Sequence, residues 1–181
     1  MRLVPTREAM TLTGLSAAKL REWTSRRALI PADIPPKSQG SSAQYSWQTI
    51  LLLRLAVRLR DQFHLELQAH RSLFASLHSN LRGKSFVALW GKTLALNGGE
   101  HWSLLDAEDN LEPAEDALLI RLDPHLKILA SGFALPHPSS VPGQLDLFPA
   151  RPVSQSQSAM TAIRSTAVAS ARPAVRQRRT G

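Results

Sequence analysis

Positively charged side chains gather near the start of the chain, at spacings that suit contact with an anionic polymer. Lys19 and Arg21 lie in one short segment, and Arg26 and Arg27 follow a few residues later. An arginine guanidinium can form two parallel hydrogen bonds with a phosphate or a guanine edge, whereas a lysine supplies a compact point charge. These residues therefore indicate binding to phosphates or bases.

Patterns that would support catalysis are weak. Gly91-Lys92-Thr93 ends like a phosphate-binding loop, but Phe86 stands where that loop requires glycine. The histidines form no pair at metal-ligand spacing, and Glu112, Glu115 and Asp116 fall in a predicted turn beside a proline. The chain has no cysteine, which excludes disulfides and thiolate metal sites. We expect no enzymatic activity and no cofactor.

Two short helices must position the cations. Thr6 is predicted to cap a first helix over residues 7–13, which Gly14 would end. Ser16 is predicted to cap a second helix, and this helix carries Lys19 and Arg21. Two helices joined by a glycine-containing turn are the usual frame for placing a helix in the major groove of DNA.

Five short motifs follow one another over the first part of the chain. They are Thr13-Gly14-Leu15-Ser16, Leu20-Arg21-Glu22-Trp23, Ala28-Leu29-Ile30-Pro31, Tyr45-Ser46 and Gln62-Phe63-His64-Leu65. In this order they resemble the MerR family of winged-helix transcription regulators, over about residues 3–80. The chain departs from the family pattern at Glu22, which replaces an aromatic residue, and by one added residue before Leu29. The resemblance implies a winged helix-turn-helix, a homodimer and regulation of transcription by binding double-stranded DNA.

The resemblance also implies which residues would contact DNA. The loop at 31–45 would be the wing, although its composition alone fits an ordinary loop equally well. Trp23 could lie against the DNA backbone or fill the core under the wing, and Tyr45 would anchor the base of the wing. The residues expected at the DNA are Ser16, Lys19, Arg21, Trp23, Arg26, Arg27, Lys37, Gln39 and Tyr45.

Two longer helices are expected next. Ser46 is predicted to cap a helix that runs to about Arg60 and is apolar on more than one face, which indicates a helix packed between others. A further helix is predicted from about residue 65 to 81, with leucines at fourfold spacing. Those leucines (Leu73, Leu77 and Leu81) could form a dimer contact, as the MerR resemblance implies, or an intramolecular core.

Residues 84–135 are predicted to form a small β-rich unit of four or five strands. The expected strands lie in the runs SFVALWG, KTLALNG, HWSLLD, ALLIRL and LKILASGF. Asn97-Gly98-Gly99, Asp109-Asn110 and Asp123-Pro124 are predicted turns between them. Because so short a segment builds little core, we expect it to pack on the helices or on a second copy. It could also act as an interaction module.

Residues 136–181 are predicted to be a disordered tail, because Pro, Ser, Ala, Gln and Arg dominate and apolar periodicity is lost. Within the tail, Gln144, Leu145, Asp146, Leu147 and Phe148 spell QLDLF. This pentapeptide resembles the motif by which bacterial replication and repair proteins bind the β sliding clamp, so the clamp is a candidate partner. The alternatives are that the segment folds back on the body or does neither. With the clamp as partner, the chain would be an accessory factor of replication, repair or a mobile element.

Charge divides the chain in the same places. Residues 1–83 carry a net +7, residues 84–150 carry −5 and residues 151–181 carry +6, within a total of +8. A basic head and tail favour an anionic polymer as partner. No signal peptide or apolar run of membrane-spanning length is visible, so we expect a cytoplasmic protein at the bacterial nucleoid. The expected fold class is α+β, with the winged helix-turn-helix at 1–83, the β-rich unit at 84–135 and the tail.

Overall fold

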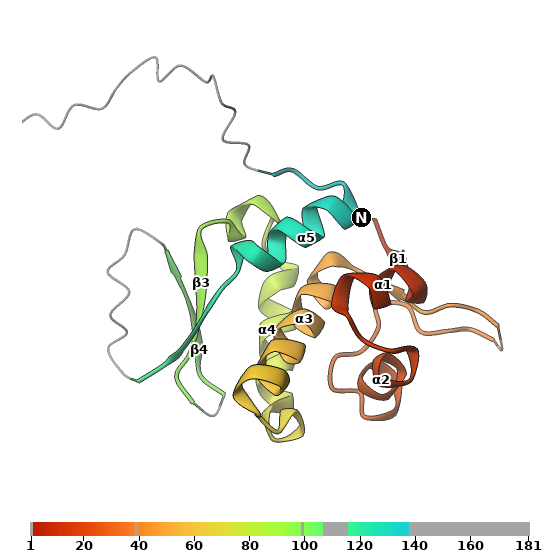
Figure 1. The fold of residues 1–181 in the computed structure, drawn as a ribbon, viewed down its shortest axis with the longest axis horizontal. Helices are drawn as coiled ribbons and strands as arrows, with labels where there is room; N and C mark the ends of the chain where they lie inside the picture. The colour runs from red at the N-terminus through yellow and green to blue at the C-terminus, as the bar shows by residue number, and fades with distance from the viewer. Residues whose placement is uncertain (1, 39, 99, 107–115, 138–181) are drawn as a thin grey trace, which may run out of the picture. The chain divides into compact units, whose positions relative to one another are not determined.

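The computed structural model describes residues 2–38, 40–98, 100–106 and 116–137. All of the described residues belong to one compact unit. This unit is a mixed α and β structure, which confirms the α+β class (Figure 1). None of its helices is both long and apolar enough to cross a membrane.

The first two helices form as expected, with one change at the start. Helix α1 spans Thr6–Thr13 and ends at Gly14, whose φ of 74° is the left-handed conformation that glycine adopts easily. The predicted cap by Thr6 is wrong. Thr6 is already helical, and its backbone N–H donates to the Ser42 hydroxyl at 3.0 Å, because a later loop supplies the acceptor. Helix α2 spans Ala17–Arg21 and continues as the π-helical turn η1, Glu22–Arg26.

Helix α3, Trp47–Phe63, is the centre of the core. Ser46 caps it by accepting a hydrogen bond from the Thr49 backbone N–H at 3.3 Å, as predicted. Ten of its residues are buried, because α1, α4 and α5 all pack against it. Figure 1 shows α3 between the sheet and the pair α1 and α2. The expectation of an enclosed helix is thus confirmed, although the helix ends three residues later than predicted.

The predicted helix over 65–81 is a 3₁₀ turn, η2 (Leu67–His70), followed by α4 (Arg71–Arg82). Leu73, Leu77 and Leu81 are each at most 4% exposed and belong to the core of their own chain. Of the two alternatives for these leucines, the intramolecular core is the correct one. They are not free to form a dimer contact.

The segment after residue 83 contains three strands, so the expectation of four or five is wrong for the described residues. Strand β3 (Lys92–Leu96) lies between β4 (Trp102–Asp106) and β5 (Leu118–Arg121), and both pairings are antiparallel. The predicted turn at Asn97 and Gly98 joins β3 to β4, and the Asn97 N–H donates to the His101 carbonyl at 3.1 Å. The turn predicted at 109–110 lies outside the described residues.

Two of the predicted strands are helical. SFVALWG contains the 3₁₀ turn η3 (Val87–Leu89), where Phe86 packs edge-on to Trp47 with ring centroids 5.2 Å apart. LKILASGF belongs to helix α5 (Asp123–Phe133). Its buried residues are spaced by three and four positions, which is a helical period, and the proline predicted to mark a turn begins the helix instead. The buried face of α5 consists of His125, Leu126, Leu129, Ala130 and Phe133.

Helix α5 explains how the sheet joins the helices. It contacts both α1 and α3, so the described residues after 83 share one core with the N-terminal helices. The two helices approach closely at Gly132, where an added Cβ would lie 2.5 Å from Cδ2 of Leu12 on α1. The expectation that the β-containing segment packs on the helices is therefore confirmed.

Candidate nucleic-acid interface

The exposed part of the helix pair is shaped by a π-helical turn. The Arg27 N–H donates to the Glu22 carbonyl at 2.8 Å, a bond that spans five residues instead of four. Such i→i+5 bonds define a π-helical turn, which is rare and often occurs at functional sites. Ala28, two residues after the turn, has a left-handed φ of 46°, and the Leu29 N–H then donates to the Trp23 carbonyl at 2.8 Å.

Two of the predicted DNA-binding arginines are exposed and unpaired. Arg21 lies at the end of α2 and Arg26 at the end of η1, and both side chains face solvent. Neither joins an ion pair with another residue in the part of the chain that the structure describes. Ser16 is exposed as well, and its hydroxyl accepts from the Lys19 N–H at 3.3 Å, which confirms the predicted cap. Both guanidinium groups can therefore meet an external anion.

Lys19 and Arg27 are placed differently, because Glu22 lies between them. The Lys19 Nζ is 2.9 Å from one Glu22 carboxylate oxygen, and the Arg27 Nε is 2.7 Å from the other. The hydrogen bond from Lys19 and the charge of Arg27 lower the pKa of Glu22, which keeps its carboxylate ionised. Glu22 thus orients two cations and cancels part of their charge.

The loop at 31–43 is a hairpin held against the helices. Ile34 and Gln44 exchange backbone hydrogen bonds of 3.1 and 2.9 Å, and strand β2 (Gln44–Tyr45) pairs antiparallel with β1 (Val4–Pro5). At its base, Asp33 Oδ2 accepts from the Ser46 N–H and from the Thr49 hydroxyl, both at 2.7 Å. Near its tip Lys37 is exposed, whereas Gln39 lies outside the described residues.

The hairpin and the second helix border the same small hollow of about 100 Å³. Arg21 and Ser25 line it from α2 and η1, and Pro36 and Ser41 line it from the hairpin. We call the exposed residues of this region the helix–loop surface. It consists of Ser16, Arg21, Ser25, Arg26, Arg27, Lys37 and Ser41, with the half-buried Lys19 at its edge.

Trp23 and Tyr45 lie below this surface. Trp23 is 3% exposed and Tyr45 2%, so both belong to the core and cannot lie along a ligand without rearrangement. The guanidinium carbon of Arg60 stands 5.0 Å from the centre of the Trp23 ring, a cation–π contact. The Tyr45 hydroxyl lies 3.5 Å from the Thr24 hydroxyl, which anchors β2 under the helix. For Trp23 the structure therefore supports the core alternative, and Tyr45 lies buried at the base of the hairpin, where it was expected to act as an anchor and not as a direct contact.

Sequence reasoning missed two residues that shape the region. Glu22 could have been found, because it follows Lys19 by three positions and such pairs meet on one helical face. Arg60 could not, since its contact with Trp23 joins residues that are far apart in the sequence and depends on how α3 packs.

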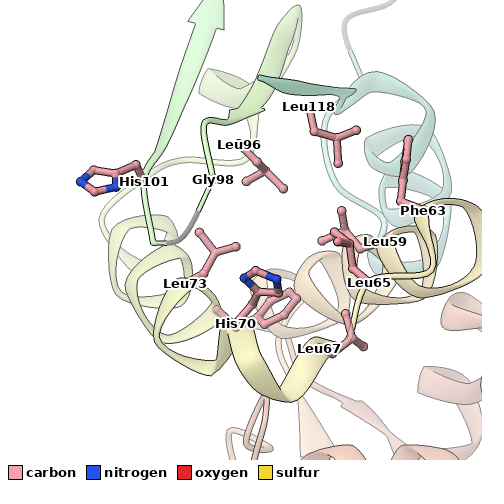
Figure 2. A pocket seen from close by; sticks show the side chains of 11 residues that line it. Leu59, Phe63, Leu65, Leu67, His70, Leu73, Leu96, Gly98, His101 and Leu118 are labelled. Carbon is pink, nitrogen blue, oxygen red and sulfur yellow. The ribbon is translucent and has the colours of Figure 1, made fainter. Parts of the chain in front are cut away.

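The rest of the described structure contains an apolar cavity of about 320 Å³ between α3, α4 and the sheet. Figure 2 shows Leu73, Leu96 and Leu118 pointing into it, with His101 turned away. The described residues include no cluster of three His, Asp or Glu side chains placed to hold a metal ion. The proposed clamp motif, residues 144–148, lies outside the described residues.

Comparison with known proteins finds no match. No protein-family model matches the chain, and no curated protein sequence is similar to it.

Proposed function

We propose that this chain is a sequence-specific DNA-binding regulator of the MerR type, and that the helix–loop surface contacts double-stranded DNA. The single observation that carries the proposal is that the unpaired, exposed Arg21 on a capped helix borders the same hollow as a hairpin that carries an exposed lysine. In winged-helix proteins the helix enters the major groove while the hairpin contacts the neighbouring backbone. The order of motifs along the sequence supports the same assignment.

Each residue then has a distinct role. Arg21 lies where α2 meets the hollow, so its planar guanidinium reads a guanine or grips a phosphate in a two-bonded fork. Arg26, Arg27 and Lys37 neutralise phosphates, and Ser16 donates to one near the start of α2. Glu22 limits nonspecific attraction by pairing with Lys19 and Arg27. Trp23 and Tyr45 support the surface from beneath.

The test begins with selection of duplexes from a random pool by the full chain. We expect one sequence to be enriched, and the MerR resemblance predicts two related half-sites read by a homodimer. Affinity for that duplex is then compared between the wild type and Arg21→Ala. If Arg21 reads a base, the loss should be about 1–3 kcal/mol and discrimination at that base should relax. The control is Lys127→Ala, which removes an exposed cation on α5 outside the surface.

If Arg21 contacts only a phosphate, affinity falls for all sequences alike and the salt slope drops by about one. Either result supports the placement of the surface. Equal affinity and equal salt dependence in Arg21→Ala and the wild type would remove Arg21 from the interface.

A further inference from the structure

A second pocket, of about 360 Å³, lies between α3, β5 and the start of α5. None of its lining residues belongs to the helix–loop surface. Its volume falls in the range of small-molecule sites, which usually combine an apolar wall with a few convergent polar groups. We call it the α3–α5 pocket.

Three arginines line the α3–α5 pocket. Arg54 and Arg58 lie one helical turn apart on α3, and Arg121 lies at the end of β5. The lining contains no carboxylate, and none of the three joins an ion pair with a described residue. Like charges at i and i+4 on a helix repel each other, so this arrangement costs energy unless an anion joins it.

Two polar atoms of the lining residues lack partners. His125 is 7% exposed, and its Nδ1 makes no hydrogen bond within the described structure. The same is true of the buried Nε of Arg54, although another nitrogen of that guanidinium donates to the Leu12 carbonyl at the end of α1. Buried polar groups nearly always have partners, and an unsatisfied one calls for an explanation such as an absent ligand.

The pKa of His125 reflects the same concentration of positive charge. Burial lowers it to about 4, and the charges of Arg54 and Arg58 add to the effect. Burial also lowers the pKa of Arg54, and the neighbouring Arg58 contributes. The imidazole is therefore neutral near neutral pH, and can donate one hydrogen bond to an anion while the arginines supply the charge.

The lining of the pocket also includes apolar residues that are open to solvent. Phe63, Leu119 and Ile128 line it and are 42%, 39% and 42% exposed. They are three of the five large apolar side chains that the described structure leaves exposed. Exposed apolar residues grouped at one site mark a binding surface more often than scattered ones do.

We propose that the α3–α5 pocket binds a small organic anion, whose charged head meets the three arginines and whose apolar body covers Phe63, Leu119 and Ile128. A bare phosphate would leave the apolar lining residues exposed, and a neutral apolar molecule would leave the arginines uncompensated. The proposal goes beyond DNA binding and does not depend on it, because its residues are separate from the helix–loop surface.

The probe for this site is octanoate, which combines a carboxylate with an apolar chain. Calorimetric titration of the full chain with octanoate should reveal one site. Octanamide, which has the same chain without the charge, and inorganic phosphate, which has charge without the chain, should each bind at least about tenfold more weakly. Replacing both Arg58 and Arg121 with Gln should weaken octanoate at least about tenfold, because two charge-assisted hydrogen bonds are lost. The matched control is the double variant Arg71→Gln/Lys127→Gln, which removes two exposed cations outside the pocket and should leave octanoate affinity unchanged.

Thermal unfolding supplies a second readout that also reports folding. Octanoate should raise the unfolding midpoint of the wild type and of the control, but not that of the Arg58→Gln/Arg121→Gln variant. Equal affinity for octanoate and octanamide would overturn the proposal. So would octanoate binding that is insensitive to Arg58 and Arg121, which would place the ligand in the apolar cavity of Figure 2.

Discussion

Substitution of Gly132 by Ala tests the way α5 closes the core against α1. An added Cβ would lie 2.5, 3.0 and 3.3 Å from three carbons of the Leu12 side chain, which is only 8% exposed. Overpacking a closed core costs about 1–3 kcal/mol. Replacing a helical glycine with alanine stabilises the helix by at most about 1 kcal/mol. The packing cost is therefore larger, and we expect Gly132→Ala to lower the free energy of unfolding by about 1 kcal/mol.

A double-mutant cycle with Leu12→Ala separates the two effects. Leu12→Ala alone should cost about 2–5 kcal/mol, because it opens a cavity in the core. In that background the Cβ at residue 132 has room, so Gly132→Ala should become stabilising and the coupling energy should be about 2 kcal/mol. Urea unfolding followed by far-UV circular dichroism measures all four proteins. If Gly132→Ala stabilises both backgrounds alike, α5 does not approach α1 as described.

Three further perturbations test other parts of the structure. Asp33→Ala should destabilise the chain by about 1.5–3 kcal/mol in urea unfolding, because a carboxylate that accepts two 2.7 Å hydrogen bonds is lost; a loss below about 0.5 kcal/mol would contradict that role. His125 should make the fold acid-sensitive, because its pKa is lowered from 6.5 to about 4 in the folded chain. As pH falls, His125 is therefore protonated in the unfolded chain at a higher pH than in the folded chain. The stability that neutral His125 contributes is intact above pH 6.5 and is lost as pH falls toward 4, with about 2 kcal/mol of unfolding free energy lost near pH 5. The difference in the pH dependence of unfolding between the wild type and His125→Leu measures this contribution. Glu22→Gln should steepen the salt dependence of binding to random-sequence DNA by about one charge, because Lys19 and Arg27 are released from their shared carboxylate; an unchanged slope would mean that neither cation reaches the DNA.

Local signals predicted the N-terminal elements well. The Ser16 and Ser46 caps and the Gly14 terminus each depend on one residue and its immediate neighbours, so the sequence contains what determines them. The cap on α1 was mispredicted because its acceptor, Ser42, comes from the hairpin. The strand prediction for α5 fails for another reason: a short run rich in Leu, Ile and Phe fits a buried strand by composition, but Leu126, Leu129 and Phe133 are spaced with a helical period.

The candidate site was predictable only in part. Charge and motif order identified Arg21 and Arg26, which are exposed, but they could not show that Trp23 and Tyr45 are buried. Burial depends on α3, whose Arg60 covers the Trp23 ring from a distant part of the sequence. The α3–α5 pocket could not be predicted from the sequence for the same reason, since Arg54, Arg121 and His125 come together only when α5 packs on α3.

The most direct test of the central claim is a charge reversal on the helix–loop surface. Binding of the full chain to a mixed-sequence DNA duplex is measured for the wild type, for Arg21→Glu and for Lys127→Glu, which changes the net charge equally from an exposed site on α5. If the surface contacts DNA, Arg21→Glu should weaken binding by about tenfold or more while Lys127→Glu changes it only slightly. Equal losses of affinity in the two variants would mean that binding depends on net charge alone, and would contradict the proposed interface.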